Sequence, residues 1–256
     1  MAKILLHGFL GRMGQATLKM VNDRTDCEIV SGVDVNLQGS VNPFPTFTDI
    51  NNCEMKPDVI IDFSTSTAVP ALIWHSMQYK IPVVICTTGL CEETLKGIGD
   101  LAKEVPVFRS YNMSYGVSLM SVLLKKISKP LHDHGFDIEI VEKHHKHKID
   151  SPSGTALLLA DSINKGLDND FEYIHSRVGT LKPRGNKEIG IQSIRGGSIV
   201  GEHSIIFAGQ NETMEFKHSA ISREAFALGA ISAALFLKDK PPGLYTMEDL
   251  IEETFI

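Results

Sequence analysis

Short apolar runs alternate with segments of helical periodicity in the first 112 residues of the chain. Each apolar run is nearly continuous, as in strands that helices cover on both faces of a sheet. Strands that alternate with helices predict parallel βαβ units, and hence an α/β domain with a doubly wound parallel sheet. The predicted strands span residues 3–7, 28–34, 58–63, 83–86 and 107–109, and the predicted helices span residues 13–22, 68–79 and 92–103.

The pattern changes after residue 112. One helical segment ends near Pro130, and two turn-forming pairs, Gly196-Gly197 and Gln210-Asn211, separate the later apolar runs. We therefore expect a second domain of the α+β class with a mixed or antiparallel sheet, whose last three strands form an antiparallel meander. Its predicted helices span residues 117–126 and 156–164, and its predicted strands span residues 138–142, 189–195, 198–208 and 213–219.

The C-terminal region returns to helical periodicity. A helix is predicted over residues 225–237, followed by a short tail, 241–256, with one more turn of helix. A lone helix needs a partner face, so we expect the longer one to pack back on the first domain. The first domain is therefore predicted to comprise residues 1–114 together with 224–256, and the second domain residues 115–223.

Composition and charge exclude several classes of function. The chain has 256 residues, of which 43% are hydrophobic and 22% charged, as is typical of a soluble globular enzyme. A net charge of −6 argues against general nucleic-acid binding, which needs a basic surface. No apolar run approaches the roughly 20 residues of a membrane span, and no signal-peptide pattern opens the chain. The cysteines form no C-x-x-C pair, so we expect reduced thiols and a cytoplasmic location.

A glycine-rich loop follows the first predicted strand. Residues 7–14 read H-G-F-L-G-R-M-G, with the spacing G-x-x-G-x-x-G, and open the first predicted helix. Glycines at such a junction let the backbone approach a pyrophosphate, which the helix N-terminal amides bind. Asp34 ends the second predicted strand 20 residues after Gly14, where an acid holds the adenosine ribose. These features favour a Rossmann-type dinucleotide site over the alternative, an ordinary glycine turn and a strand-end aspartate.

The residues around Asp34 bear on the choice between NADH and NADPH. The next two residues, V-N, offer no positive charge to a 2′-phosphate, although Arg12 in the glycine loop can compensate. We therefore expect the chain to accept NADH at least as well as NADPH. The loops at 86–89 and 110–114 each follow an apolar strand, at the sheet edge where ligands gather. They are interpreted either as the lining of a nicotinamide pocket or as plain turns.

Residues 143–148, which read K-H-H-K-H-K, hold the densest group of cationic and imidazole side chains in the chain. Imidazole titrates near neutral pH and can donate a proton, while ammonium groups and free helix N-terminal amides attract carboxylates. A helix start follows at once, which Ser151 or Ser153 can cap, and Gly154 leaves its amides bare for an anion. The segment therefore predicts a site for a small dianionic substrate that is protonated on carbon. The alternatives are a solvated basic loop and a metal site, and the interleaved lysines argue against the metal.

Other polar residues have a structural interpretation beside a functional one. Glu139 and Glu142 either orient histidines or are exposed strand residues. Glu202 and His203 lie on a predicted strand and are expected to be structural. His7 ends the first predicted strand and is expected to be a core or loop histidine.

The segment E-K-H-H-K-H-K-I-D-S-P-S-G-T-A at 142–156 resembles the signature of the dihydrodipicolinate reductase (4-hydroxy-tetrahydrodipicolinate reductase) family of the bacterial lysine and diaminopimelate pathway. The chain departs from some members of that family at Leu10, Met113 and Val35, where they carry glycine, phenylalanine and a basic residue. Further motifs similar to that family occur in order along nearly the whole chain: G-x-x-G-R-M-G at 8–14, D-F-S at 62–64, T-T-G at 87–89, N-M-S-Y-G at 112–116, R-G-G-S-I-V-G-E-H at 195–203 and S-R-E-A-F-A-L-G-A at 222–230.

The resemblance implies an oxidoreductase that reduces 4-hydroxy-tetrahydrodipicolinate (dihydrodipicolinate), a cyclic imine dicarboxylate, to tetrahydrodipicolinate with NADH or NADPH. It implies that His144 protonates C3 of the ring after hydride reaches C4, that Lys148 is its catalytic partner, and that the second domain's sheet builds a homotetramer. The substrate-binding residues that it implies are His145, Ser153, Gly154 and Thr155. The cofactor-binding residues that it implies are Gly8, Phe9, Leu10, Gly11, Arg12, Met13, Asp34, Cys86, Thr87, Thr88, Ser110, Tyr111, Asn112 and Met113.

Two other functions fit part of the pattern. A non-catalytic Rossmann dinucleotide sensor would keep the glycine loop but has no need of the histidine–lysine segment. Another two-domain dehydrogenase, such as aspartate-semialdehyde dehydrogenase, needs a nucleophilic cysteine near a histidine. No cysteine here is convincingly placed for that role, since Cys86 ends an apolar run and has the pattern of core packing.

Overall fold

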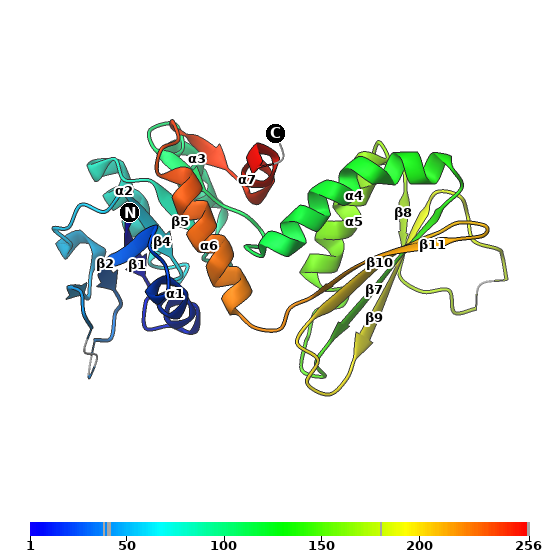
Figure 1. The fold of residues 1–256 in the computed structure, drawn as a ribbon, viewed down its shortest axis with the longest axis horizontal. Coiled ribbons are helices and arrows are strands. Elements are labelled where there is room, and N and C mark those ends of the chain that lie inside the picture. Colours follow the sequence, from blue (N-terminus) through cyan, green and yellow to red (C-terminus); the bar gives the residue numbers. More distant parts are fainter. Residues whose placement is uncertain (38, 40–41, 180, 255–256) are drawn as a thin grey trace. The chain divides into compact units, whose positions relative to one another are not determined.

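The computed structural model describes residues 1–37, 39, 42–179 and 181–254, which form two compact units (Figure 1). The first unit comprises Met1–Tyr115 and Arg223–Ile256, and the second comprises Gly116–Ser222. The C-terminal segment therefore belongs to the same unit as the N-terminal segment.

The first unit contains a seven-stranded parallel sheet in the order β12-β6-β5-β4-β1-β2-β3. The chain winds outward in both directions from the adjacent strands β1 and β4, which confirms the predicted doubly wound, Rossmann-type sheet. The strands are β1 (Ala2–His7), β2 (Cys27–Val33), β3 (Thr46–Phe47), β4 (Val59–Asp62), β5 (Val83–Ile85), β6 (Pro106–Phe108) and β12 (Gly243–Tyr245). The α-helices are α1 (Arg12–Asn22), α2 (Val69–Tyr79), α3 (Glu92–Leu101), α6 (Glu224–Leu237) and α7 (Met247–Thr254), and a 3₁₀ turn spans Ile50–Asn52.

Helices cover both faces of this sheet, as consecutive residues of β1 show. Ile4 and Leu6 belong to the core that β1 shares with α1 and α6, whereas Leu5 belongs to the core shared with α2 and α3. Because side chains alternate across a strand, a strand buried on both faces must be apolar at every position. This is the physical reason for the short continuous apolar runs in the sequence.

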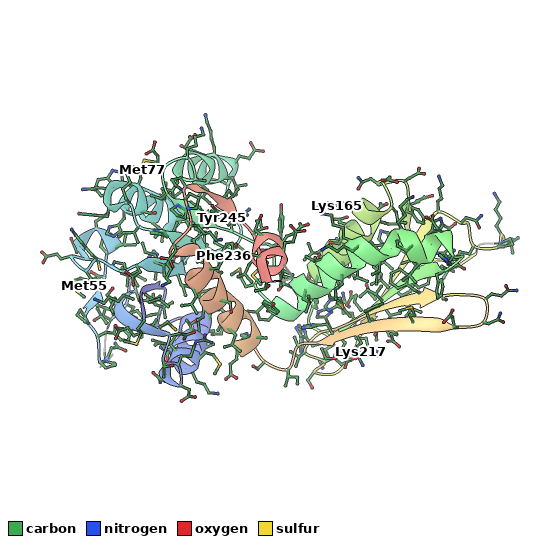
Figure 2. All side chains as sticks on the ribbon, turned by 45° about the horizontal axis from the view of Figure 1, so that its top comes forward. Met55, Met77, Lys165, Lys217, Phe236 and Tyr245 are labelled. Carbon is green, nitrogen blue, oxygen red and sulfur yellow. The ribbon has the colours of Figure 1, made fainter. Side chains whose placement is uncertain are left out.

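The C-terminal tail contains more structure than the sequence pattern predicted. We expected one turn of helix after residue 241, but Gly243–Tyr245 forms an edge strand paired with β6, and α7 has 8 residues. Phe236 of α6 and Tyr245 of β12 pack edge to face, with ring centroids 5.7 Å apart (Figure 2). A strand of three residues is too short to show a periodicity, so tertiary pairing alone defines it.

The second unit contains a five-stranded sheet in the order β11-β10-β7-β9-β8. The central strand β7 pairs parallel with β9 on one side and antiparallel with β10 on the other, so the sheet is mixed. The strands are β7 (Asp137–His144), β8 (Glu172–Ile174), β9 (Glu188–Arg195), β10 (Glu202–Ala208) and β11 (Thr213–Ser219), and the helices are α4 (Tyr115–Asp133) and α5 (Gly154–Gly166).

The predicted antiparallel meander is wrong at its first turn. The turn at Gln210-Asn211 does join the neighbouring antiparallel strands β10 and β11. Gly196-Gly197, in contrast, begins a link that leaves β9, passes the end of β7 and enters β10 on the other side. The turn residues correctly predicted that the chain reverses direction between β9 and β10. They carry no information about β7, which lies between these two strands in the sheet.

The predicted end of the helix near residue 126 is also wrong, because α4 runs through Pro130 to Asp133 and is 19 residues long. Proline removes the hydrogen bond to the carbonyl four residues earlier, here that of Lys126. Lys126 and Pro130 both lie on the exposed side of the helix, where water can serve that carbonyl. Neither α4 nor any other helix in the described part of the chain is long and apolar enough to cross a membrane.

The close approach of α6 to the loop after β6 generates a stability prediction. A Cβ on Gly229 would lie 1.6 Å from the backbone oxygen of Met113, so Gly229→Ala must push the helix and the loop apart. We expect this variant to lose about 1–3 kcal/mol of the free energy of unfolding, measured by urea denaturation with circular dichroism.

Gly99 in α3 is the matched control. It is exposed, and nothing lies within 4 Å of the Cβ that Gly99→Ala would add. That variant should keep its stability or gain up to about 1 kcal/mol through helix propensity. Equal destabilisation of both variants would contradict the steric argument.

Candidate active site

His144 ends the central strand β7 of the second unit, with β9 and β10 on its two sides. Its side chain is largely buried. The link after β9 passes this end of the strand, and the N–H of Gly196 donates to the backbone oxygen of His144 at 3.0 Å. The topology therefore brings residues from three strands and one link around a single imidazole.

Glu142 lies two residues before His144 and so shares its face of the strand. Its carboxylate is fully buried, and Nδ1 of His144 lies 2.6 Å from Oε2. Arg195 donates two hydrogen bonds to the same carboxylate, from Nη1 to Oε2 at 2.8 Å and from Nη2 to Oε1 at 2.7 Å. The N–H of Ser153 also donates to Oε1, at 3.1 Å. Of the two interpretations of Glu142 from the sequence, the exposed strand residue is wrong.

Glu142 is ionised at neutral pH. Burial alone would raise its pKa, but hydrogen bonds from Arg195, Ser193 and His144 outweigh burial and lower the pKa to about 2. An ionised carboxylate only accepts hydrogen bonds, so Nδ1 of His144 is the donor in this contact. The other ring nitrogen, Nε2, is left to exchange a proton with a ligand.

A second imidazole, that of His203 on β10, lies beside His144, with ring centroids 5.2 Å apart. We expected His203 to be structural, but the structure places it in this cluster, where its Nε2 lies 2.9 Å from Oγ of Ser153. Burial, followed by the nearby positive charge of His144, lowers the pKa of His203 to about 4. His203 is therefore neutral at neutral pH and is no competitor for the proton.

The start of α5 completes the cluster. Ser153, rather than Ser151, is the N-cap residue, because its Oγ accepts from the N–H of Ala156 at 3.1 Å. The helix begins at Gly154, which is exposed and has nothing within 4 Å of the position of a Cβ. The first turn of α5 can therefore be approached by an anion next to the Glu142–His144 pair.

The remaining predicted residues of the second unit lie on the loop before α5. Nζ of Lys148 pairs with Asp150 at 2.8 Å, and its side chain is mostly buried. His145 is half-buried, and its Nδ1 has no hydrogen-bond partner among the described residues. Thr155 follows Gly154 in the first turn of α5. A ligand at this helix start would meet polar groups from both the loop and the helix.

The glycine loop of the first unit has the geometry of a phosphate cradle. Gly8 has a φ of +79°, and a Cβ there would lie 2.6 Å from the backbone oxygen of Phe63. A Cβ on Gly14 would lie 2.3 Å from the backbone oxygen of Gly8. Gly11 is the N-cap residue of α1 and makes no side-chain cap hydrogen bond, so the first-turn amides are available to a phosphate. These residues fit a dinucleotide.

Burial separates the predicted cofactor contacts into two kinds. Asp34 accepts the N–H of Leu10 at 3.0 Å and is thereby held beside the glycine loop. Phe9 and Met113, in contrast, are buried in the apolar core, so only their backbone atoms can serve a ligand. The side chains with full access to solvent are those of Arg12, Thr88 and Tyr111.

Asp62 at the end of β4 contacts residues at or just after the ends of three strands, a role that the sequence did not reveal. It is fully buried and accepts hydrogen bonds from Thr87 at 2.6 Å and from Oγ of Ser64 at 2.5 Å, and Nδ1 of His7 lies 3.0 Å away. Next to Thr87, burial followed by the charge of Asp62 raises the pKa of the Cys86 thiol well above its usual value. A raised pKa disfavours the nucleophilic thiolate, which agrees with the core-packing interpretation of Cys86.

The described residues contain no group of three or more histidine, cysteine, aspartate or glutamate side chains that could hold a metal ion. The Glu142–His144 pair lies next to the start of α5 and has the chemistry for proton transfer and anion binding. It combines an imidazole oriented by a carboxylate with an accessible helix N-terminus.

Comparisons with known proteins agree along the whole chain. The profile for the N-terminus of dihydrodipicolinate reductase matches residues 2–113, and the profile for its C-terminus matches residues 116–251. The 4-hydroxy-tetrahydrodipicolinate reductase of Caldanaerobacter subterraneus subsp. tengcongensis is 48% identical over 253 residues, which cover 99% of each chain. The protein of the same name from Clostridium tetani is 47% identical over 251 residues, covering 98% of this chain and 97% of that one.

A solved structure shares the fold. The dipicolinate-bound dihydrodipicolinate reductase from Paenisporosarcina sp. TG-14 superimposes with a TM-score of 0.79 at 24% identity, covering 96% of this chain and 97% of that one. The family assignment comes from both profiles and from the relatives that are close to half identical over nearly their full lengths. The chain belongs to the dihydrodipicolinate reductase family.

Proposed function

We propose that this chain reduces 4-hydroxy-tetrahydrodipicolinate to tetrahydrodipicolinate with NADH or NADPH, in the pathway to diaminopimelate and lysine. The observation that carries the proposal is His144, held at Nδ1 by the ionised Glu142 beside the accessible start of α5. A proton donor next to an anion site suits a ring that carries two carboxylates and is protonated on carbon. The relatives named 4-hydroxy-tetrahydrodipicolinate reductase support the same reaction.

The predicted second domain, residues 115–223, is proposed to bind the substrate. One carboxylate lies at the first turn of α5, on the amides of Gly154 and Thr155, with Ser153 at the edge of the site. Lys148 turns from Asp150 to the ligand and supplies a positive charge, and His145 offers its buried Nδ1. These contacts orient the ring with one face toward His144.

His144 is proposed to be the general acid. Loss of the 4-hydroxyl group as water leaves the unsaturated imine, dihydrodipicolinate, to whose β carbon a bound NADH or NADPH would supply a hydride. The electron pair that moves onto the ring nitrogen gives an enamine, whose α carbon must take up a proton. His144 delivers this proton from Nε2, while Nδ1 stays bound to Glu142. The charge of Lys148 stabilises the electron-rich ring.

The predicted first domain, residues 1–114 with 224–256, is proposed to bind the dinucleotide. The first-turn amides of α1 and the glycines before them receive the pyrophosphate, and Asp34 binds the adenosine ribose. The carboxylate of Asp34 repels a 2′-phosphate, whereas Arg12 attracts one. We therefore propose that the enzyme accepts NADH at least as well as NADPH.

A coupled reductase assay tests the function and the cofactor preference together. The enzymatically generated substrate should be reduced with either nicotinamide, and kcat/KM with NADH should equal or exceed that with NADPH. A preference for NADPH of more than about tenfold in kcat/KM would overturn the assignment of Asp34. Tight dinucleotide binding without any turnover would favour a non-catalytic sensor instead.

Two substitutions should separate proton donation from substrate binding. His144→Gln should lower kcat by roughly 10²–10⁴, the span of a lost general acid, with little change in KM. Lys148→Ala should mainly raise KM, because it removes a charge that binds carboxylate. Steady-state kinetics of both variants measure the two effects.

The same segment offers matched controls. His147 and Lys146 are exposed and differ from the substituted residues by only three and two positions in the chain. His147→Gln and Lys146→Ala should keep near-normal kcat and KM. If His144→Gln turned over as fast as His147→Gln, the proposed role of His144 would be refuted.

We further propose that the protein is a cytoplasmic homotetramer assembled through the sheet of the second unit, which also follows from the family resemblance. Light scattering after size-exclusion chromatography should give a mass about four times the 28.2 kDa of one chain. A monomeric mass at micromolar concentration would exclude this assembly, and cell fractionation tests the location.

A further inference from the structure

We propose that Glu142 and Arg195 form a positioning pair that selects the proton donor: Glu142 fixes the tautomer of His144 and keeps its second proton in place, and Arg195 keeps Glu142 ionised. This inference rests on the proposed function, since it concerns the acid of that reaction. Glu142 contacts both His144 and Arg195, so Glu142 acts on the reaction through His144, and Arg195 acts through Glu142.

The hydrogen-bond pattern of Glu142 favours the ionised form. Oε1 receives the N–H of Ser153 and one Nη of Arg195, while Oε2 receives the other Nη and Nδ1 of His144. The arginine and the backbone amide are donors in every state. A protonated Glu142 could give its proton only to Nδ1 of His144, because the arginine and the amide cannot accept it. Arg195 donates to both carboxylate oxygens and so favours the anion, with Nδ1–H of His144 as the donor.

Charged and titratable groups near the Glu142–His144 pair come from three strands and one loop. β7 provides Glu142, β9 provides Arg195, β10 provides His203, and the loop before α5 provides Lys148 and Asp150. The Glu142–Arg195 pair is internally balanced, and so is the Lys148–Asp150 pair.

His144 differs from His203 in one contact. His203 touches the hydroxyl of Ser153, whereas His144 touches a carboxylate. Burial lowers the pKa of His203 to about 4, and its Nδ1 has no hydrogen-bond partner among the described residues. Of the two facing imidazoles, only His144 has a carboxylate in contact with its ring. Glu142 is the residue that makes this distinction.

The opposite edge of the His144 ring is kept open by Gly201. A Cβ at this position would lie 3.1 Å from Nε2 of His144. The link between β9 and β10 therefore passes close to the reactive nitrogen without a side chain that would cover it. One ring nitrogen is hydrogen-bonded to Glu142, and any side chain larger than that of glycine at position 201 would crowd the other.

The first test uses the wild-type enzyme and needs no turnover. ¹⁵N NMR of histidine-labelled protein, assigned by the loss of a signal in His144→Gln, reports the tautomer of each neutral imidazole. We expect the neutral form of His144 to be protonated at Nδ1, the tautomer that free imidazole side chains disfavour. A neutral form protonated at Nε2 would overturn the proposal, whatever the activity of the enzyme.

The second test is the pH dependence of kcat. A general acid must be protonated, so kcat falls as the pH rises through the alkaline limb of the profile. Glu142→Gln removes the negative charge and should move this limb to lower pH by about one pH unit or more. Arg195→Gln leaves the carboxylate but removes the cation, so it should move the limb to higher pH.

Glu202→Gln is the matched control. Glu202 lies on β10 next to the site but pairs with Lys143 and with Lys217, at 3.5 Å and 3.0 Å (Lys217 is labelled in Figure 2). Its removal should leave the limb where it is in the wild type. Shifts of Glu142→Gln and Arg195→Gln in the same direction, or no shift in a folded Glu142→Gln, would contradict the proposal.

The outcomes separate this inference from the proposed function. If the wild type lacks reductase activity, the proposed function fails, and the tautomer still decides the role of Glu142. If the wild type is active but the tautomer is the common one, the function stands and the positioning pair is refuted. If Glu142→Gln does not fold, the NMR measurement on the wild type remains decisive.

Discussion

The second unit depends on one buried carboxylate, that of Glu142. Removing a carboxylate from water costs several kcal/mol unless charge and hydrogen bonds compensate it. Arg195, Ser153 and His144 provide that compensation, and they come from β9, from the cap of α5 and from β7 itself. The stabilisation of the anion and the orientation of the imidazole are therefore the same set of contacts, so neither can change without the other.

The chemistry of the candidate site could be predicted from the sequence, but its geometry could not. The K-H-H-K-H-K segment and the helix start are adjacent along the chain, so local spacing was enough to identify them. Arg195 lies 53 residues from Glu142, and their contact exists only because β9 pairs with β7. The predicted meander lacked this pairing, and for this reason both Glu142 and His203 retained a structural interpretation.

The first unit shows the same division between local and long-range information. A glycine turn between a strand and a helix is a local feature, and the loop from Gly8 to Gly14 has the predicted form. The burial of Phe9 and Met113 depends on α6, which joins this unit from the far end of the sequence. Asp62 contacts His7 at the end of β1 and Thr87 after β5, and these contacts could be predicted only from the order of strands in the sheet.

The place of β7 in the middle of its sheet has a consequence for how the protein matures. A central strand gains its neighbours only when the segments on both sides have paired with it, and here those segments come later in the chain. Before β9 and β10 dock, His144 has neither the guanidinium beside its carboxylate nor the second imidazole. The reactivity of His144 should therefore appear only once the five-stranded sheet has formed. Partly folded chains should contain the whole K-H-H-K-H-K segment but lack its proton-transfer activity.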